Sequence, residues 1–274
     1  MEPRLASDLI VSAAAAAYAG SSAAFFVHIS TRGGSSRATG LARTLLWLGA
    51  VLQFAFVVHY GVVFRVCPMK TINLAISLAV VVMCVAYLLV PKTFKADALG
   101  LFVVPVALVF LIASRFIGLP DVPLNLRNKL LPVHISTNVL GDAFFVLASG
   151  AAAMYLFQEH QLKAKRGASV FGRIPPLDTL DTAAHRFLLI GFVFMTVGAV
   201  TGSVWVSKLT MGTTVEMLRI MLGYVTWAVF SCVLLLRSTL GWRGKRAAYG
   251  TLAGFVLSML VVALYLGRAG MEPR

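Results

Sequence analysis

The feature that most constrains this chain is a series of long apolar runs. A helix needs about 20 residues to cross a hydrocarbon core of about 30 Å. Eight runs of this kind occur, at about 8–30, 44–64, 72–91, 97–116, 131–157, 184–204, 213–236 and 247–267. Because only 12% of the 274 residues are charged and 59% are hydrophobic, a water-soluble surface is excluded. The sequence predicts an all-α polytopic membrane protein with a bundle of about eight transmembrane helices, forming one domain over residues 1–274.

Basic residues outnumber acidic ones, with 24 Lys and Arg against 10 Asp and Glu. On a soluble protein this excess would indicate nucleic acid, but here it lies mostly in short loops, where it sets topology and contacts anionic lipid. We therefore expect the lipid bilayer as a partner and no nucleic acid. The loops at 31–43, 92–96, 158–186 and 237–246 hold fourteen basic residues, and the remaining loops and termini hold nine. The positive-inside rule then places both termini outside the cell.

Two histidines lie inside predicted spans at similar depth. His59 lies a little over one turn from the outer end of the second run, and His134 lies in the first turn of the fifth. Two imidazoles in apolar surroundings at matched depth suit the axial ligation of haem iron, and they also suit another metal. Alternatively, each histidine hydrogen-bonds a neighbour and has no ligand.

Other polar residues in the spans are also candidates, because burying them in a membrane costs free energy. Asp142 lies two turns after His134, and it could orient a ligand, relay a proton or pair within the helix packing. Arg219, together with Arg65 or Arg115, could bind carboxylates such as haem propionates, or Arg219 could pair with nearby Glu216.

Motifs of enzyme chemistry are missing from the sequence. It has no phosphate-binding Gly-rich loop, no HExxH and no GxSxG. We therefore expect no catalytic residues and a protein that is not an enzyme. Small residues at helical spacing in the sixth run, Gly191, Gly198 and Gly202, predict close packing of two helices.

Several stretches of the C-terminal half resemble one known family. They are PLDTLD at 176–181, HRFLLIGF at 185–192, TVGAVTGSVW at 196–205, GWRGKRAAY at 241–249 with Gly254 and Phe255, and PVHIS at 132–136. Together they resemble the cytochrome c assembly family, of the CcsA/CcmC/HemX type. The resemblance is strongest over residues 125–267.

The resemblance implies haem handling at the outer face of a bacterial cytoplasmic membrane. It implies that His134 corresponds to an external haem-ligating histidine and His59 to a histidine of a membrane span. Haem b, held without a covalent bond, is the expected cofactor. The haem iron is then the only metal that we expect His59 and His134 to bind. The expected partners are haem and apocytochrome c or a cytochrome c assembly subunit.

The chain also departs from the core members of that family. They carry a tryptophan-rich WWD segment before the seventh span, where this chain reads VSKLTMGTTVEML at 206–218, and Leu235 stands close to the place of an expected histidine. The closer resemblance is therefore to the eight-span HemX-like or YpjD-like branch without WWD. This leaves two alternatives to haem delivery. One is a regulator or scaffold that contacts a haem-biosynthetic enzyme through residues 158–173, and the other is a proton-coupled transporter using Asp142.

Overall fold

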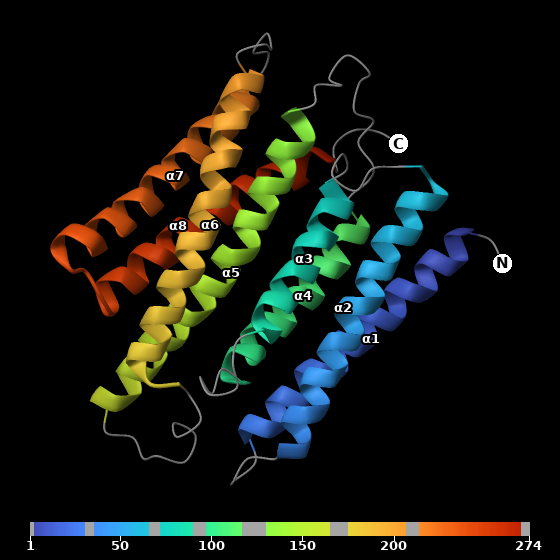
Figure 1. The fold of residues 1–274 in the computed structure, drawn as a ribbon, viewed down its shortest axis with the longest axis horizontal. Helices are drawn as coiled ribbons and strands as arrows, with labels where there is room; N and C mark the ends of the chain where they lie inside the picture. Colours follow the sequence, from blue (N-terminus) through green and yellow to red (C-terminus); the bar gives the residue numbers. More distant parts are fainter. Residues whose placement is uncertain are drawn as a thin grey trace.

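The computed structural model describes residues 3–30, 36–65, 72–89, 97–116, 130–164, 175–206 and 214–269. Within these residues the chain forms helices and no strands (Figure 1). The helices are α1 Pro3–Ser30, α2 Ser36–Val63, α3 Ile72–Leu88, α4 Asp97–Phe116, α5 Leu130–Lys163, α6 Leu177–Val206, α7 Thr214–Leu240 and α8 Lys245–Ala269.

Each predicted apolar run corresponds to one of these helices. Seven of the described helices are long and apolar enough to cross a membrane, and α3 is a shorter apolar helix. The predicted polytopic, all-helical fold is thus confirmed. Several helices extend beyond their apolar runs: α2 begins at Ser36, α5 continues to Lys163 and α6 begins at Leu177. Hydropathy marks only the segment that suits lipid, whereas a helix continues through polar residues for as long as its backbone hydrogen bonds can form.

The helices form two groups of four that are consecutive in the sequence. In the N-terminal bundle, α1 packs on α2, α2 on α3, α3 on α4, and α4 back on α1. The C-terminal bundle repeats this closed arrangement with α5, α6, α7 and α8. Helix α5 also packs against α3 and α4, so it joins the two bundles at the centre of the molecule (Figure 1).

The two ends of the molecule are distinguished by the direction of the helices. Odd-numbered helices begin and even-numbered helices end at the upper end in Figure 1. We call this the histidine end, because it carries His59 near the end of α2 and His134 near the start of α5. We call the opposite end the arginine end, for Arg43 at the start of α2 and Arg237 at the end of α7. The sides of the membrane that these ends face stay a prediction.

The N-terminal bundle has the larger apolar core. Tyr18, Phe25 and Tyr87 are fully buried there, and the cluster continues into α5. A smaller cluster in the C-terminal bundle is built on Phe145 and Phe230, whose rings stack with centroids 4.1 Å apart. Helices α6 and α7 expose much of their apolar surface, as expected for helices that face lipid.

Candidate functional site

His134 lies in the first turns of α5 and faces α6. Its Nδ1 lies 2.8 Å from the backbone carbonyl oxygen of Gly198, and its side chain is half-buried. A carbonyl oxygen can only accept a hydrogen bond, so Nδ1 must be the donor. A neutral imidazole carries one ring hydrogen, which leaves the lone pair on Nε2. This is the tautomer that a metal-ligating histidine needs, because a hydrogen bond from the other nitrogen fixes the orientation of the ring.

Asn138, one turn further along α5, completes the local arrangement. Its Nδ2 donates to the His134 backbone oxygen at 2.7 Å and lies 3.2 Å from Nδ1 of the same residue. Because Nδ1 already donates to Gly198, it carries a hydrogen and cannot accept one from the Asn138 amide. The amide therefore donates to the backbone oxygen of His134. Asn138 also lies against Gly198 of α6, the residue whose carbonyl accepts from the imidazole.

Two glycines of α6 make room for these side chains. A Cβ atom at Gly202 would lie 2.5 Å from Cε1 of His134, and one at Gly198 would lie 2.5 Å from Nδ2 of Asn138. Real Cβ atoms do not approach other atoms so closely, so any larger residue would displace the imidazole or the amide. The close helix packing predicted from Gly191, Gly198 and Gly202 is confirmed, and two of these three glycines also form the surface against which His134 lies.

His59 lies at the same end of the molecule, but in the other bundle. Its Nδ1 is 3.2 Å from the hydroxyl oxygen of Ser7 in α1. A hydroxyl can donate or accept, so this contact leaves the tautomer of His59 open. Helix α3 packs on both α2 and α5 and therefore lies between the helices that carry the two histidines. The structure thus places His59 and His134 at one end, with their ring contacts on α1 and α6 respectively.

Asp142 has its partner on a different helix from that of His134. Its Oδ1 accepts a short hydrogen bond from the hydroxyl of Ser258 in α8. Eight residues along a helix correspond to about 12 Å of rise and a rotation of about 80°, so Asp142 is turned from α6 toward α8. Its contact is therefore with Ser258 rather than with the imidazole.

The three arginines proposed as propionate contacts also lie at the histidine end. Arg65 follows the end of α2, is exposed and has a left-handed backbone conformation (φ 51°). Arg115 lies in the last turn of α4, and its side chain is outside the described part of the structure. Arg219 is only 6% exposed and donates through Nη2 to the carbonyl oxygen of Leu264 in α8. Arg219 thus ties α7 to α8.

A second polar site, at the arginine end, involves residues that are not among the candidate site residues predicted from the sequence. Both oxygens of Asp181 in α6 accept from the guanidinium of Arg237 in α7, at 3.0 and 2.7 Å. The Asp181 Oδ1 atom also accepts from the backbone N–H of Gly244 at 2.9 Å. Both side chains are nearly buried, with exposed fractions of 12% for Arg237 and 10% for Asp181. We call these three residues the C-terminal clasp.

The clasp brings two of the sequence motifs together. Asp181 closes the PLDTLD stretch, and Gly244 belongs to the GWRG stretch. Gly244 has φ +64°, a conformation that favours glycine, and a Cβ atom there would lie 2.5 Å from the hydroxyl of Tyr155. The two motifs, 63 residues apart in sequence, therefore meet through one hydrogen bond.

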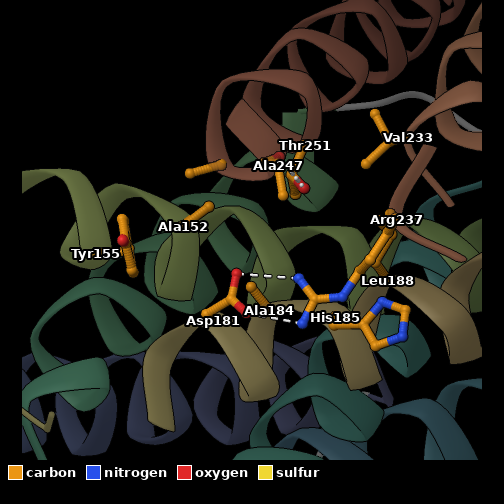
Figure 2. A pocket seen from close by; sticks show the side chains of 11 residues that line it. Ala152, Tyr155, Asp181, Ala184, His185, Leu188, Val233, Arg237, Ala247 and Thr251 are labelled. Carbon is orange, nitrogen blue, oxygen red and sulfur yellow. Dashed lines mark hydrogen bonds and ion pairs between the residues drawn. The ribbon is translucent and has the colours of Figure 1, made fainter. Parts of the chain in front are cut away.

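A small pocket adjoins the clasp (Figure 2). It lies between α5, α6, α7 and α8, with small side chains such as Ala152 and Ala184 on its walls. His185 lies on the Arg237 side of the pocket, and within the described residues its buried Nδ1 has no hydrogen-bond partner. Its position near the end of a span gives His185 no evident role in the sequence alone. The signal that was available is its position four residues after Asp181, on the same helix face.

The family model described as cytochrome C assembly protein matches residues 36–266, which is most of the chain. The chain belongs to the cytochrome c assembly protein family. The resemblance drawn from the motifs is confirmed, and the match includes both α2 and α5, which carry His59 and His134.

Relatives fall under two names. The cytochrome c biogenesis protein CcsA of Prochlorococcus marinus strain MED4 is 26% identical over 206 residues, covering 66% of this chain and 64% of the relative. The CcsA of Guillardia theta is 29% identical over 192 residues, covering 62% of each chain. Protein HemX of Brevibacillus brevis is 26% identical over 226 residues, covering 80% of this chain and 82% of the relative.

The chain therefore matches less than two thirds of the length of these CcsA relatives. No solved structure matches it significantly. Within the described residues, no group of three or more His, Cys, Asp and Glu side chains is placed to hold a metal ion.

Proposed function

We propose that this multi-pass membrane protein binds haem b at its histidine end and assists cytochrome c assembly at the outer face of a bacterial cytoplasmic membrane. The observation that carries the proposal is the hydrogen bond from His134 Nδ1 to the Gly198 carbonyl. It sets the imidazole in the tautomer that offers Nε2 to iron. Membership of the family supports haem and an apocytochrome c, or another assembly subunit, as partners.

The residues at this end fit a haem better than a bare ion. A porphyrin supplies four nitrogen ligands, so the protein has to add only one or two axial imidazoles. His134 is the first ligand in this proposal. His59 would be the second ligand, which requires its ring to leave the Ser7 hydroxyl on α1. When bound, the haem supplies the iron chemistry, and the protein's own residues bind and orient it.

Charge at the same end suits the haem carboxylates. Arg65 is exposed next to the end of α2, six residues beyond His59. A guanidinium can hold a propionate through two parallel hydrogen bonds. In our proposal Arg65 and Arg115 contact the propionates directly. Arg219 keeps α7 and α8 together beside them through its bond to Leu264.

The test is a visible absorption spectrum of the detergent-purified chain after addition of haem, in both redox states, with a pyridine haemochrome assay. We expect a low-spin b-type spectrum that His134→Ala abolishes and that His59→Ala converts to a high-spin form. His160→Ala is the matched control, because His160 is exposed near the arginine end. Full haem with unchanged spectra in both single variants would refute this site.

One observation favours a second candidate function, a regulator or scaffold of haem biosynthesis without stable haem. The alignment with Protein HemX covers 82% of that relative, against 64% for a CcsA relative. In this alternative, residues 158–173 contact a haem-biosynthetic enzyme; of these, 165–173 lie outside the described residues. Replacing 165–173 with a Gly-Ser segment of equal length should then change the level of that enzyme and leave haem binding intact. An unchanged enzyme level would remove the alternative.

A further inference from the structure

The turn between α7 and α8 concentrates positive charge at the arginine end. Arg243, Lys245 and Arg246 lie within four residues, and all three side chains are exposed. Within the described residues none of them forms an ion pair. Asp181, which accepts from the N–H of Gly244 in this turn, already accepts from both terminal guanidinium nitrogens of Arg237. Within the part of the chain that the structure describes, no ion pair therefore neutralises the positive charge of the turn.

The backbone of the turn is fixed rather than loose. Gly241, with φ +65°, ends α7, and the N–H of Trp242 donates back to the Leu236 carbonyl at 3.2 Å. Gly244 is held by its bond to Asp181, and its carbonyl accepts from Ala248 in the first turn of α8 at 2.9 Å. The cationic side chains thus project from a preformed scaffold, which reduces the entropy lost when a ligand binds.

Aromatic rings lie beside two of the cations. The Arg246 guanidinium carbon lies 5.8 Å from the centroid of the Trp242 ring, and the Lys245 Nζ lies 5.7 Å from that of Tyr249. The turn also lies between two apolar spans, Thr214–Leu240 and Lys245–Leu264, so it is at the depth where a bilayer has its headgroups. Tryptophan and tyrosine are typical of that depth.

We infer that the α7–α8 turn binds the phosphate of an anionic phospholipid headgroup through Arg243, Lys245 and Arg246. The charges are complementary, the turn is rigid, and the two spans place it at the level of lipid phosphates. Basic clusters at the ends of membrane helices attract anionic lipid near the membrane surface. The site is separate from the proposed haem site, which lies at the other end of the molecule.

The test is titration of the purified full chain with phosphatidylglycerol, followed by native mass spectrometry, with phosphatidylcholine as the neutral lipid. We expect Arg243→Gln with Arg246→Gln to weaken retention of phosphatidylglycerol at least about tenfold. The matched control is Arg37→Gln with Lys163→Gln, which removes equal charge from exposed positions at the same end. We expect it to change retention less than twofold.

A charge-conserving pair separates folding from binding, since Arg243→Lys with Arg246→Lys should retain the lipid. Equal losses in the test pair and the control pair would show a general charge effect and overturn the site. Loss of lipid on addition of inorganic phosphate at millimolar concentration would show a site for a free anion instead. Retention unchanged in the Gln pair would also overturn the inference.

Discussion

The two bundles have the same arrangement of four helices, but the polar contacts at the arginine end are shorter and more numerous in the C-terminal bundle. At the arginine end of each bundle, an arginine and an aspartate connect three helices. In the N-terminal bundle Arg43 of α2 lies 3.4 Å from Asp97 of α4 and donates to the Leu88 carbonyl of α3 at 2.9 Å. We call these residues the N-terminal clasp. The C-terminal clasp has two short bonds to one carboxylate and a third from a backbone N–H.

The difference follows the size of the apolar cores. The N-terminal bundle buries a large cluster that includes Tyr18, Phe25 and Tyr87, so apolar packing already holds its helices together. In the most apolar windows of α6, α7 and α8, only 28%, 22% and 28% of the window, respectively, is buried inside the protein. In the C-terminal bundle, the polar clasp therefore connects helices that share little apolar packing. Specific polar residues at helix ends are therefore expected to matter most where the core is thinnest.

The largest effect that we expect comes from breaking the C-terminal clasp. Arg237→Met leaves the nearly buried carboxylate of Asp181 without its guanidinium, which should cost about 3 kcal/mol of unfolding free energy. Thermal unfolding of the detergent-purified chain, followed by circular dichroism, measures this loss. Arg237→Met with Asp181→Leu removes both charges and should recover part of it. No recovery in the double variant would contradict the assigned pairing.

The turn glycines should give the next largest effect, in a graded series. Gly244→Ala combines an unfavourable positive φ with the clash against Tyr155, and should cost about 2–3 kcal/mol. Gly241→Ala has the positive φ but nothing within 4 Å, and should cost about 1 kcal/mol. Gly223→Ala, in open space within α7, should stay within about 1 kcal/mol of the parent. The same unfolding measurement ranks the three, and any other order would count against the clasp geometry.

Breaking the N-terminal clasp should cost less stability than breaking the C-terminal clasp. Arg43→Met removes the long contact to Asp97, whose side chain is 29% exposed, together with the hydrogen bond to the Leu88 carbonyl, and should cost about 1–2 kcal/mol. Unfolding of this variant beside Arg237→Met tests the comparison between the bundles directly. Equal losses in the two variants would show that the thinner core does not depend more on its clasp.

A further effect falls on haem rather than on stability. Gly202→Ala pushes a methyl group against the His134 ring and should shift the haem spectrum or weaken haem binding about tenfold, because it disturbs the bond to Gly198. Gly223→Ala is again the control, since it adds the same methyl group away from any neighbour. A titration with haem, followed by absorbance, measures both variants. Identical haem affinities and spectra in the two variants would contradict a contact between the haem and His134.

The sequence predicts the helices well and the side-chain partners poorly. Hydropathy locates each helix of the described residues, because each run must match the thickness of a bilayer. It also places His59 and His134 at one end, since that needs only the position of each residue in its span. The direction in which a side chain points depends on which helix packs on which face. Asp142 therefore meets Ser258 of α8, although it lies only two turns from His134.

The C-terminal clasp cannot be predicted from local spacing, although the sequence does carry an indication of it. Asp181 and Arg237 are 56 residues apart, so no local spacing pairs them. Both nevertheless lie in loops or helix ends that the charge distribution places on one side of the membrane. An acidic residue and a basic residue at the ends of neighbouring spans are candidates for such a pair, and the family motifs around them support that reading.

The central claim is that Nε2 of His134 ligates the haem iron while Nδ1 donates to Gly198. The most direct measurement is rescue of His134→Gly by added imidazole, followed in the visible spectrum of the haem-loaded chain. Our account predicts that the variant loses the low-spin signal and that imidazole restores it, with no comparable rescue by 2-methylimidazole, which is too crowded next to the nitrogen. A variant that keeps its low-spin spectrum without imidazole would contradict the claim.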